Sequence, residues 1–224
     1  MTRRLTIGWP ADVPVPAGTR LPLRLLAVSD ERDPGLEQAH NRAQIGKIDA
    51  VLGCGDLEPD YLCFLGDAFR VPLLYVKGNH DHGQGWAAGS ESIPRPLGAA
   101  GQELAGINVR GLSWPGDERW RSRRDEGAGW GQSARLYLRA RLSIRPHIIL
   151  SHVPPRGLGD AEADPYHTGF AGYRWLCRSL RPVLWLHGHT TLASARQLTT
   201  QCQSTTLVNV TGAVLIQLDP AATG

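Results

Sequence analysis

Side chains able to bind a cation or move a proton follow five short apolar runs in this 224-residue chain. They are Asp30, Asp56, Asn79 with His80, His152 and His189. Carboxylates, an amide oxygen and imidazoles make a mixed oxygen and nitrogen donor set, which suits Mn, Fe or Zn better than Ca. Asp81 comes directly after His80, and a carboxylate there can orient an imidazole that donates a proton. The residues therefore predict a metal site with a proton donor beside it.

The elements that carry these side chains are predicted from the hydrophobic pattern. Runs of strand formers occupy residues 23–28, 50–53, 71–76, 107–112, 147–150 and 183–186. Helical patterns are expected over residues 35–48, 57–65, 132–142 and 170–180. The alternation of strands and helices over residues 23–76 implies a parallel sheet that collects ligands at the carboxyl ends of its strands.

The remaining segments complete the predicted organisation. Residues 1–22 are rich in proline and are predicted to form an N-terminal arm or an edge strand. Residues 83–101 and 114–131 are expected to be irregular, and residues 197–218 to form two or three antiparallel strands. No repeat or linker interrupts the pattern, so we predict a single domain over residues 1–224.

The composition limits which partners and which cellular compartment the sequence suggests. The net charge of +3 is too small to indicate nucleic acid by itself. The four cysteines form no CxxC pair, which is typical of free thiols in a reducing cytoplasm. No apolar run approaches the length of about 18 residues that a transmembrane helix needs. We expect a cytoplasmic protein without a membrane partner, and the oligomeric state stays open.

The motifs, taken in order, resemble those of the calcineurin-like metallophosphoesterases. Residues 55–60 (GDLEPD) match the family's GDxxD, and residues 78–81 match its GNHD. Residues 151–155 (SHVPP) are similar to the segment of its lone histidine, and residues 188–189 to the start of its GHxH. The resemblance covers roughly residues 23–218. It implies an α/β fold of four layers, with two mixed β-sheets flanked by helices.

The same resemblance implies a two-metal site. Asp56 would bridge both metals. Asn79, His152 and His189 would complete one metal position, and Asp30 would serve the other.

Two positions depart from the family pattern. DxH is Asp30-Glu31-Arg32 here, and GHxH ends in Thr191. Both missing histidines bind the same metal in the family, so one position is complete and its neighbour is depleted. Arg32 puts a fixed positive charge where an imidazole would bind a cation. The enzyme could use one metal, the depleted position could still fill with help from Glu31 or water, or catalysis could be lost.

The catalytic and substrate-binding roles rest on four residues. The resemblance implies that His80 approaches the leaving-group oxygen or the phosphate and that Asp81 orients it. Arg32 could hold the phosphate in place of the second metal. His167, in the loop 160–170, could reach the metal rim and contact substrate, although a solvated loop histidine is an equal interpretation.

Other candidates stay open. His187 and His189 could be a retained HxH pair in a different register. His40 and His147 are interpreted as structural. The arginine-rich segment 118–126, with Trp114, Trp120 and Trp130 as stacking surfaces, would suit nucleic acid but is more often a solvated loop.

The predicted function is hydrolysis of a small phosphomonoester, phosphodiester or nucleotide, with one or two divalent ions of Mn, Fe or Zn. The alternative is a weak or inactive member of this fold that binds a nucleotide or a protein. A nuclease that uses the arginine and tryptophan loop is a third hypothesis.

Overall fold

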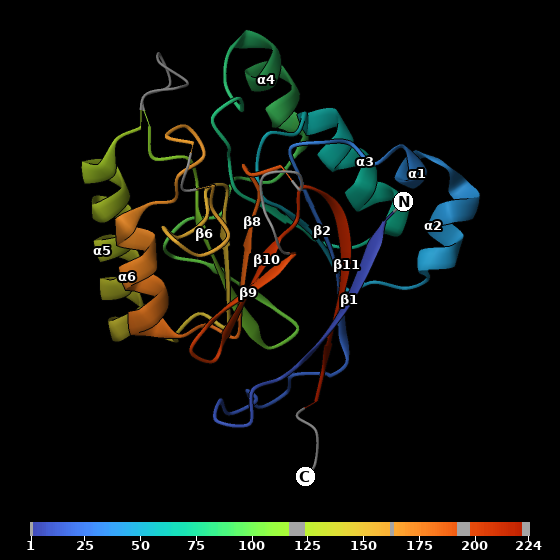
Figure 1. Cartoon of the computed structure of the whole chain (residues 1–224). Coiled ribbons are helices and arrows are strands. Elements are labelled where there is room, and N and C mark those ends of the chain that lie inside the picture. The colour runs from blue at the N-terminus through green and yellow to red at the C-terminus, as the bar shows by residue number, and fades with distance from the viewer. Residues whose placement is uncertain (1, 117–123, 162–163, 192–197, 221–224) are drawn as a thin grey trace.

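A computed structural model describes residues 2–116, 124–161, 164–191 and 198–220 (Figure 1). Five strands form the first sheet, in the order β1 (Arg3–Gly8), β11 (Gly212–Asp219), β2 (Leu23–Ser29), β3 (Ala50–Gly53) and β4 (Leu73–Tyr75). β2, β3 and β4 are parallel, whereas β11 runs antiparallel to β2. β1 is an edge strand that pairs in parallel with β11.

The second sheet is also mixed. Its order is β5 (Gln102–Leu104), β6 (Ile107–Leu112), β7 (Ile148–Ser151), β8 (Leu184–His187), β10 (Thr205–Asn209) and β9 (Thr199–Cys202). The four inner strands are parallel, and the two edge strands are antiparallel to their neighbours.

Helices cover the outer face of each sheet (Figure 1). The first sheet carries α1 (Pro34–Glu37), α2 (Ala39–Ile45), α3 (Pro59–Phe69) and α4 (Gln84–Gly89), the last followed by the 3₁₀ turn η1 (Ser90–Ser92). The second carries α5 (Glu126–Leu142) and α6 (Ala171–Leu180). The predicted fold, two mixed sheets flanked by helices, is confirmed.

The alternation of side chains along each strand builds three apolar layers. On β2, Leu25 and Ala27 face the second sheet, whereas Leu26 and Val28 face the helices of the first. On β7, Ile148 faces the first sheet and Ile149 faces α5 and α6. The tight contact between the two sheets brings the ends of their parallel strands to one edge of the molecule.

Several predicted boundaries differ from the structure. The helix expected over residues 35–48 is divided at Gln38, whose backbone is extended. α5 begins six residues earlier than expected, because the Asp125 side chain accepts a hydrogen bond from the Ala128 amide. A short helix, α4, lies within residues 83–101, which were expected to be irregular.

The prediction of an antiparallel C-terminal tail was only partly right. β9 and β10 are antiparallel, but β10 also pairs in parallel with β8. The chain then crosses to the first sheet, where β11 pairs between β1 and β2. The sequence reveals strand alternation but not which sheet a strand joins, because both sheets offer similar apolar faces.

Candidate active site

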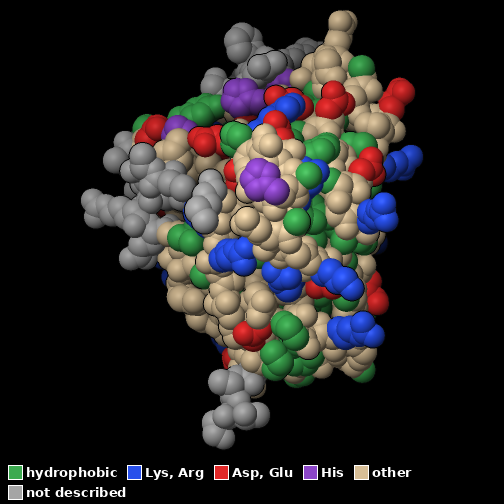
Figure 2. All heavy atoms as spheres, turned by 90° about the vertical axis from the view of Figure 1, so that its right-hand side faces the viewer, with side chains coloured by type: hydrophobic (Ala, Val, Ile, Leu, Met, Phe, Trp, Pro, Cys, Tyr) green, Lys and Arg blue, Asp and Glu red, His purple; other side chains and the backbone are tan. Residues whose placement is uncertain are grey.

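The five turns that carry the predicted donor side chains lie together at the edge where the two sheets meet. Asp30 follows β2, Asp56 follows β3, and Asn79 and His80 follow β4. His152 and His189 follow β7 and β8 of the second sheet. On the face drawn in Figure 2, histidine and acidic side chains gather toward the upper end.

His152 is the centre of this cluster and is fully buried. Its Nε2 atom lies 2.9 Å from Asn79 Oδ1 and 3.3 Å from Asp56 Oδ2. The same atom lies 3.1 Å from His189 Nδ1. Asn79 Oδ1, Asp56 Oδ2 and His189 Nδ1 therefore surround this one nitrogen, and we call these four residues the complete position.

Hydrogen bonds on the outer side of His152, His189 and Asn79 fix which atom of each faces inward. His152 Nδ1 lies 2.9 Å from the carbonyl oxygen of Cys54, and His189 Nε2 lies 3.0 Å from that of Tyr166. A carbonyl only accepts, so each ring donates there and turns the lone pair of its other nitrogen inward. Asn79 Nδ2 donates to Tyr166 Oη at 2.8 Å, which turns its Oδ1 inward as well. Acceptor atoms of Asn79, Asp56 and His189 thus surround His152 Nε2, and this donor set fits a divalent cation.

The charges of the cluster agree with that fit. Burial lowers the pKa of His152, but the carboxylates of Asp56 and Asp30 outweigh it and raise the pKa to about 9. Burial acts to raise the pKa of Asp56, yet His152 and the His80 amide lower it to about 2. Burial, and then repulsion by His152, lower the pKa of His189 to about 3. The cluster therefore favours one positive charge at its centre, and a metal ion would compete with a proton for that place.

The backbone at these turns is unusual. Asp30, Asp56 and His189 have φ values of 61°, 56° and 65°, in the left-handed region. Such residues cost about 1–3 kcal/mol each and are concentrated at functional sites. A Cβ at Gly78 would collide with the Asp56 carboxylate, and one at Gly188 would collide with Asp30. The motif glycines are needed because the loops approach each other so closely.

His80 and Asp81 have different surroundings. The His80 amide donates to Asp56 Oδ1 at 2.8 Å, its Nε2 lies 4.0 Å from Asp56 Oδ2, and its side chain is 55% exposed. Asp81 Oδ2 accepts the amides of Asp56 and Gly78, both at 2.8 Å. Within the described residues, no hydrogen bond joins Asp81 to the His80 ring. Asp81 therefore holds two loops together, in place of the orienting contact that the sequence suggested.

The depleted position, at Asp30, Arg32 and Thr191, is built differently. Both Asp30 oxygens accept the His189 amide, at 3.1 and 3.0 Å, and burial raises the pKa of this carboxyl. Donor atoms of Asp30, Asp56 and His152 lie within 4.8 Å of one another. Thr191 is exposed. One carboxylate is thus in place for a second ion, without an imidazole from position 32 or 191.

Arg32 lies toward the helices of the first sheet. Its Nε donates to Glu58 Oε2 at 3.0 Å, and its guanidinium lies 5.2 Å from the centre of the Tyr61 ring. A second carboxylate, on Glu37, is 3.9 Å away. The phosphate contact suggested for Arg32 would require this exposed side chain to change partners.

His187 does not pair with His189 in the way the alternative register suggested. It is the last residue of β8, is 1% exposed, and its ring packs against Gly159. Burial lowers its pKa to about 4. His189 contributes to the cluster, whereas the His187 ring lies against the loop that follows β7.

The loop after β7 covers the complete position. His167 is hydrogen-bonded to Asp164, and its ring centre is 5.1 Å from that of His189. Asp160 closes the loop by accepting the amides of Gly157 and Gly169 at 2.8 and 2.7 Å. Tyr166, which the sequence did not single out, holds both Asn79 and His189. Nothing in its spacing from the motifs could have revealed this, because the contact depends on how the loop folds back.

The arginine and tryptophan segment is only partly described, because residues 118–123, with Trp120, lie outside the described ranges. Trp114 packs near the site, with its ring 5.6 Å from that of His189. Arg124 donates to the Gly169 carbonyl at 2.9 Å and lies 4.6 Å from the Phe170 ring. Arg124 therefore supports the loop after β7.

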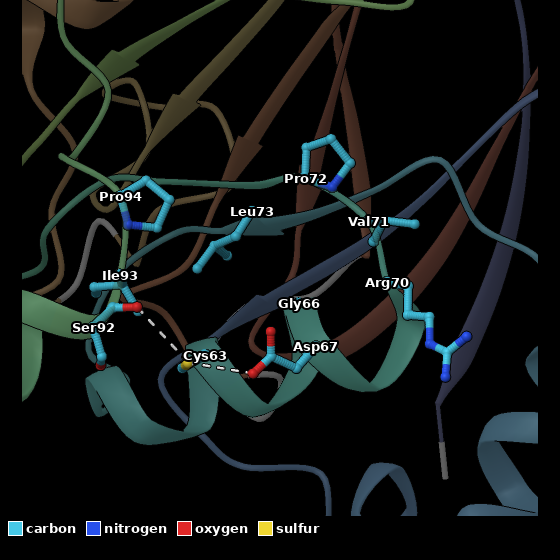
Figure 3. A pocket seen from close by; sticks show the side chains of 10 residues that line it. All are labelled: Cys63, Gly66, Asp67, Arg70, Val71, Pro72, Leu73, Ser92, Ile93 and Pro94. Atoms are coloured by element: carbon cyan, nitrogen blue, oxygen red, sulfur yellow. Dashed lines mark hydrogen bonds between the residues drawn. The ribbon is translucent and has the colours of Figure 1, made fainter.

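A separate pocket of about 550 Å³ lies beside α3 and contains none of the predicted site residues (Figure 3). Cys63 lines it and lies 3.7 Å from Asp67 Oδ2 and 3.8 Å from the Ser92 carbonyl. Desolvation and Asp67 raise the pKa of this thiol, so the group is a weak nucleophile.

Comparisons with known proteins identify the family and the fold. Residues 29–191 match the family profile described as calcineurin-like phosphoesterase. TT1561 of Thermus thermophilus is similar in structure, with a TM-score of 0.57 and 16% identity over 86% of this chain and 90% of its own. Another crystal structure gives a TM-score of 0.60 and 16% identity, over 86% of this chain and 91% of that one. At such identity the likeness shows the fold alone. A search of curated proteins gave no match.

Proposed function

The chain belongs to the calcineurin-like phosphoesterase family, and we propose that it hydrolyses a small phosphoester, including nucleotides, with one firmly held divalent ion of Mn, Fe or Zn. The observation that carries this proposal is the set of four inward-facing acceptor atoms on Asp56, Asn79, His152 and His189. The depleted position lacks two imidazole ligands, so any second ion would be held more weakly.

The bound ion and the side chains around it would have different roles in the reaction. A divalent cation supplies Lewis-acid polarisation of a phosphoryl oxygen and a nucleophilic water at neutral pH. His80 stands beside Asp56 with an exposed ring and would donate a proton to the leaving oxygen. Cys54 and Tyr166 hold the two imidazoles in the tautomers that ligation requires.

Arg32 and His167 are proposed to contact the substrate. The ion pair of Arg32 with Glu58 is exposed, with 46% and 63% of the two side chains accessible, and such pairs contribute only about 0–1 kcal/mol. The free energy that Arg32 loses when it leaves Glu58 is therefore small, and a bidentate contact with a phosphate would offset it. His167 reaches the same rim from the loop after β7.

Turnover of bis-p-nitrophenyl phosphate tests the proposal. Protein purified without chelator is compared with His80→Ala, Asp56→Asn and the control His40→Ala, an exposed histidine on α2. We expect one metal ion per chain in wild type and His80→Ala, and a rate about 10²–10⁴-fold lower in His80→Ala. Asp56→Asn should lose both metal and activity. Equal rates in wild type, His80→Ala and Asp56→Asn would refute phosphoester hydrolysis at this site.

The loss of imidazoles at positions 32 and 191 favours one second candidate, a binding protein without turnover. It predicts nucleotide or protein binding over the same rim and no rate above background with any of the three metals. The same assay therefore separates the two candidates.

A further inference from the structure

The outer face of α5 exposes apolar side chains that a folded protein normally buries. Within the described ranges, the large hydrophobic side chains with high exposure are Val15, Trp130, Leu138, Leu142 and Ile144. Four of these five lie on α5 or in the turn that follows it. Leu142 is 86% exposed, Ile144 62% and Leu138 59%. We call Trp130, Leu138, Leu142 and Ile144 the α5 apolar face.

The helical repeat puts Leu138 and Leu142 on the same side of α5. At about 100° per residue, Leu138 and Leu142 project opposite to Leu136 and Ala140, which are buried against the second sheet. Aromatic rings extend the surface toward α6, because Trp175 packs 5.8 Å from Trp130.

Positive charge flanks this face. Arg135, Arg139, Arg141 and Arg145 are all exposed beside it. Residues 126–145 and 171–181 contain seven arginines and a single acid, Glu126. The whole chain has a net charge of only +3, so the rest of the molecule is net negative. The charge is concentrated on the helical layer that carries the apolar face.

The exposed apolar side chains and the arginines beside them together indicate what could bind the α5 apolar face. A second copy of the chain would place arginine against arginine, which disfavours a symmetric contact. None of the described helices is long and apolar enough to cross a membrane. Exposed leucines on a helix, with arginines on both flanks and tryptophan beside them, are the residue types expected of a helix that lies in an anionic lipid interface.

We propose that the α5 apolar face binds the surface of an anionic lipid membrane, with Leu138, Leu142 and Ile144 entering the interface. The expectation of no membrane partner came from the absence of a spanning run, which does not bear on surface binding. α5 lies on the side of the molecule opposite α1, α2 and α3 (Figure 1).

Vesicle sedimentation tests this proposal with the full chain. The probes are phosphatidylcholine–phosphatidylserine vesicles and pure phosphatidylcholine vesicles. Arg139→Glu with Arg141→Glu should weaken binding to the anionic vesicles at least about thirtyfold. Leu138→Ser with Leu142→Ser should weaken it at least about tenfold. Lys47→Glu with Arg95→Glu makes the same charge change on exposed residues elsewhere and should leave binding unchanged.

The outcomes are distinct. Binding to the anionic vesicles that falls with salt and is lost in both α5 variants, but not in the control, supports the proposal. No binding to either vesicle overturns it, and so does binding unaffected by the leucine substitutions. A dimer in sedimentation velocity that the leucine variant dissociates would also overturn it, in favour of a second copy. Since the substituted side chains are exposed, unchanged melting temperatures are expected, and the two variants report independently.

Discussion

The complete and depleted positions share Asp56 but are built by different means. At the complete position, His152, His189 and Asn79 are each fixed by an outer hydrogen bond, to Cys54 or to Tyr166. At the depleted position, Asp30 is held by the His189 amide, and Arg32 pairs with Glu58. Metal affinity depends on donors held in place before the ion arrives. Two neighbouring positions that share a carboxylate can therefore differ in affinity because of their supporting contacts.

The largest effect should come from two residues on the same turn. His189→Ala removes an imidazole of the complete position and should reduce turnover about 10³-fold, with loss of metal. Thr191→Ala, two residues later at the depleted position, should leave both nearly unchanged. Elemental analysis of purified protein and steady-state kinetics check both variants. If Thr191→Ala reduced metal content as much as His189→Ala, the distinction between the positions would fail.

A smaller effect is expected from the support of the complete position. Tyr166→Phe removes the hydroxyl that receives Asn79 Nδ2 and keeps the carbonyl that holds His189. Metal affinity should fall about 10–100-fold, while saturating metal restores most of the turnover. Chelator competition measures the affinity. Tyr137→Phe, on α5, is the matched control, and equal loss in both would exclude a positioning role for Tyr166.

Restoring the two histidines of the depleted position should change the number of metal ions per chain more than the turnover rate. Arg32→His with Thr191→His restores both missing imidazoles beside Asp30 and Asp56, so the metal content should rise from one ion per chain toward two. Each single variant should stay near one. Titration followed by elemental analysis gives the count, and a double variant that still holds one ion would show that Asp30 is committed to the His189 amide.

The smallest effect concerns a histidine outside both positions. His147 Nδ1 accepts the Asn108 amide at 3.1 Å, and burial lowers the pKa of this ring. The folded protein therefore takes up its proton at lower pH than the unfolded chain. This contribution to stability is present above the unfolded pKa of about 6.5 and is lost as the pH falls toward the folded pKa.

His147→Asn keeps an acceptor and removes the titration. The variant should lose less stability than wild type between neutral and mildly acidic pH. Urea melts at several pH values measure this difference, and parallel stability curves for the two proteins would contradict it.

Much of the site was accessible from sequence because its ligands sit next to recognisable elements. The apolar runs before Asp56 and His152 predicted strands, and parallel strands deliver their carboxyl ends to one edge. The contact between Asn79 and Tyr166 spans 87 residues, and that between Thr211 and Asp30 spans 181. No local pattern records such contacts, because they depend on how loops from two sheets fold over each other.

The amino-acid sequence by itself determined the residue types of the proposed donor set, the two altered positions and the order of strands and helices, because these follow from residue types and hydrophobic period. Only the tertiary structure decided which nitrogen of each imidazole faces inward, that Asp81 holds loops together, and that Arg32 lies against Glu58. It also decided that β11 joins the first sheet. These outcomes are set by packing of distant segments, where differences of a few kcal/mol among similar apolar faces and hydrogen-bond partners select one arrangement.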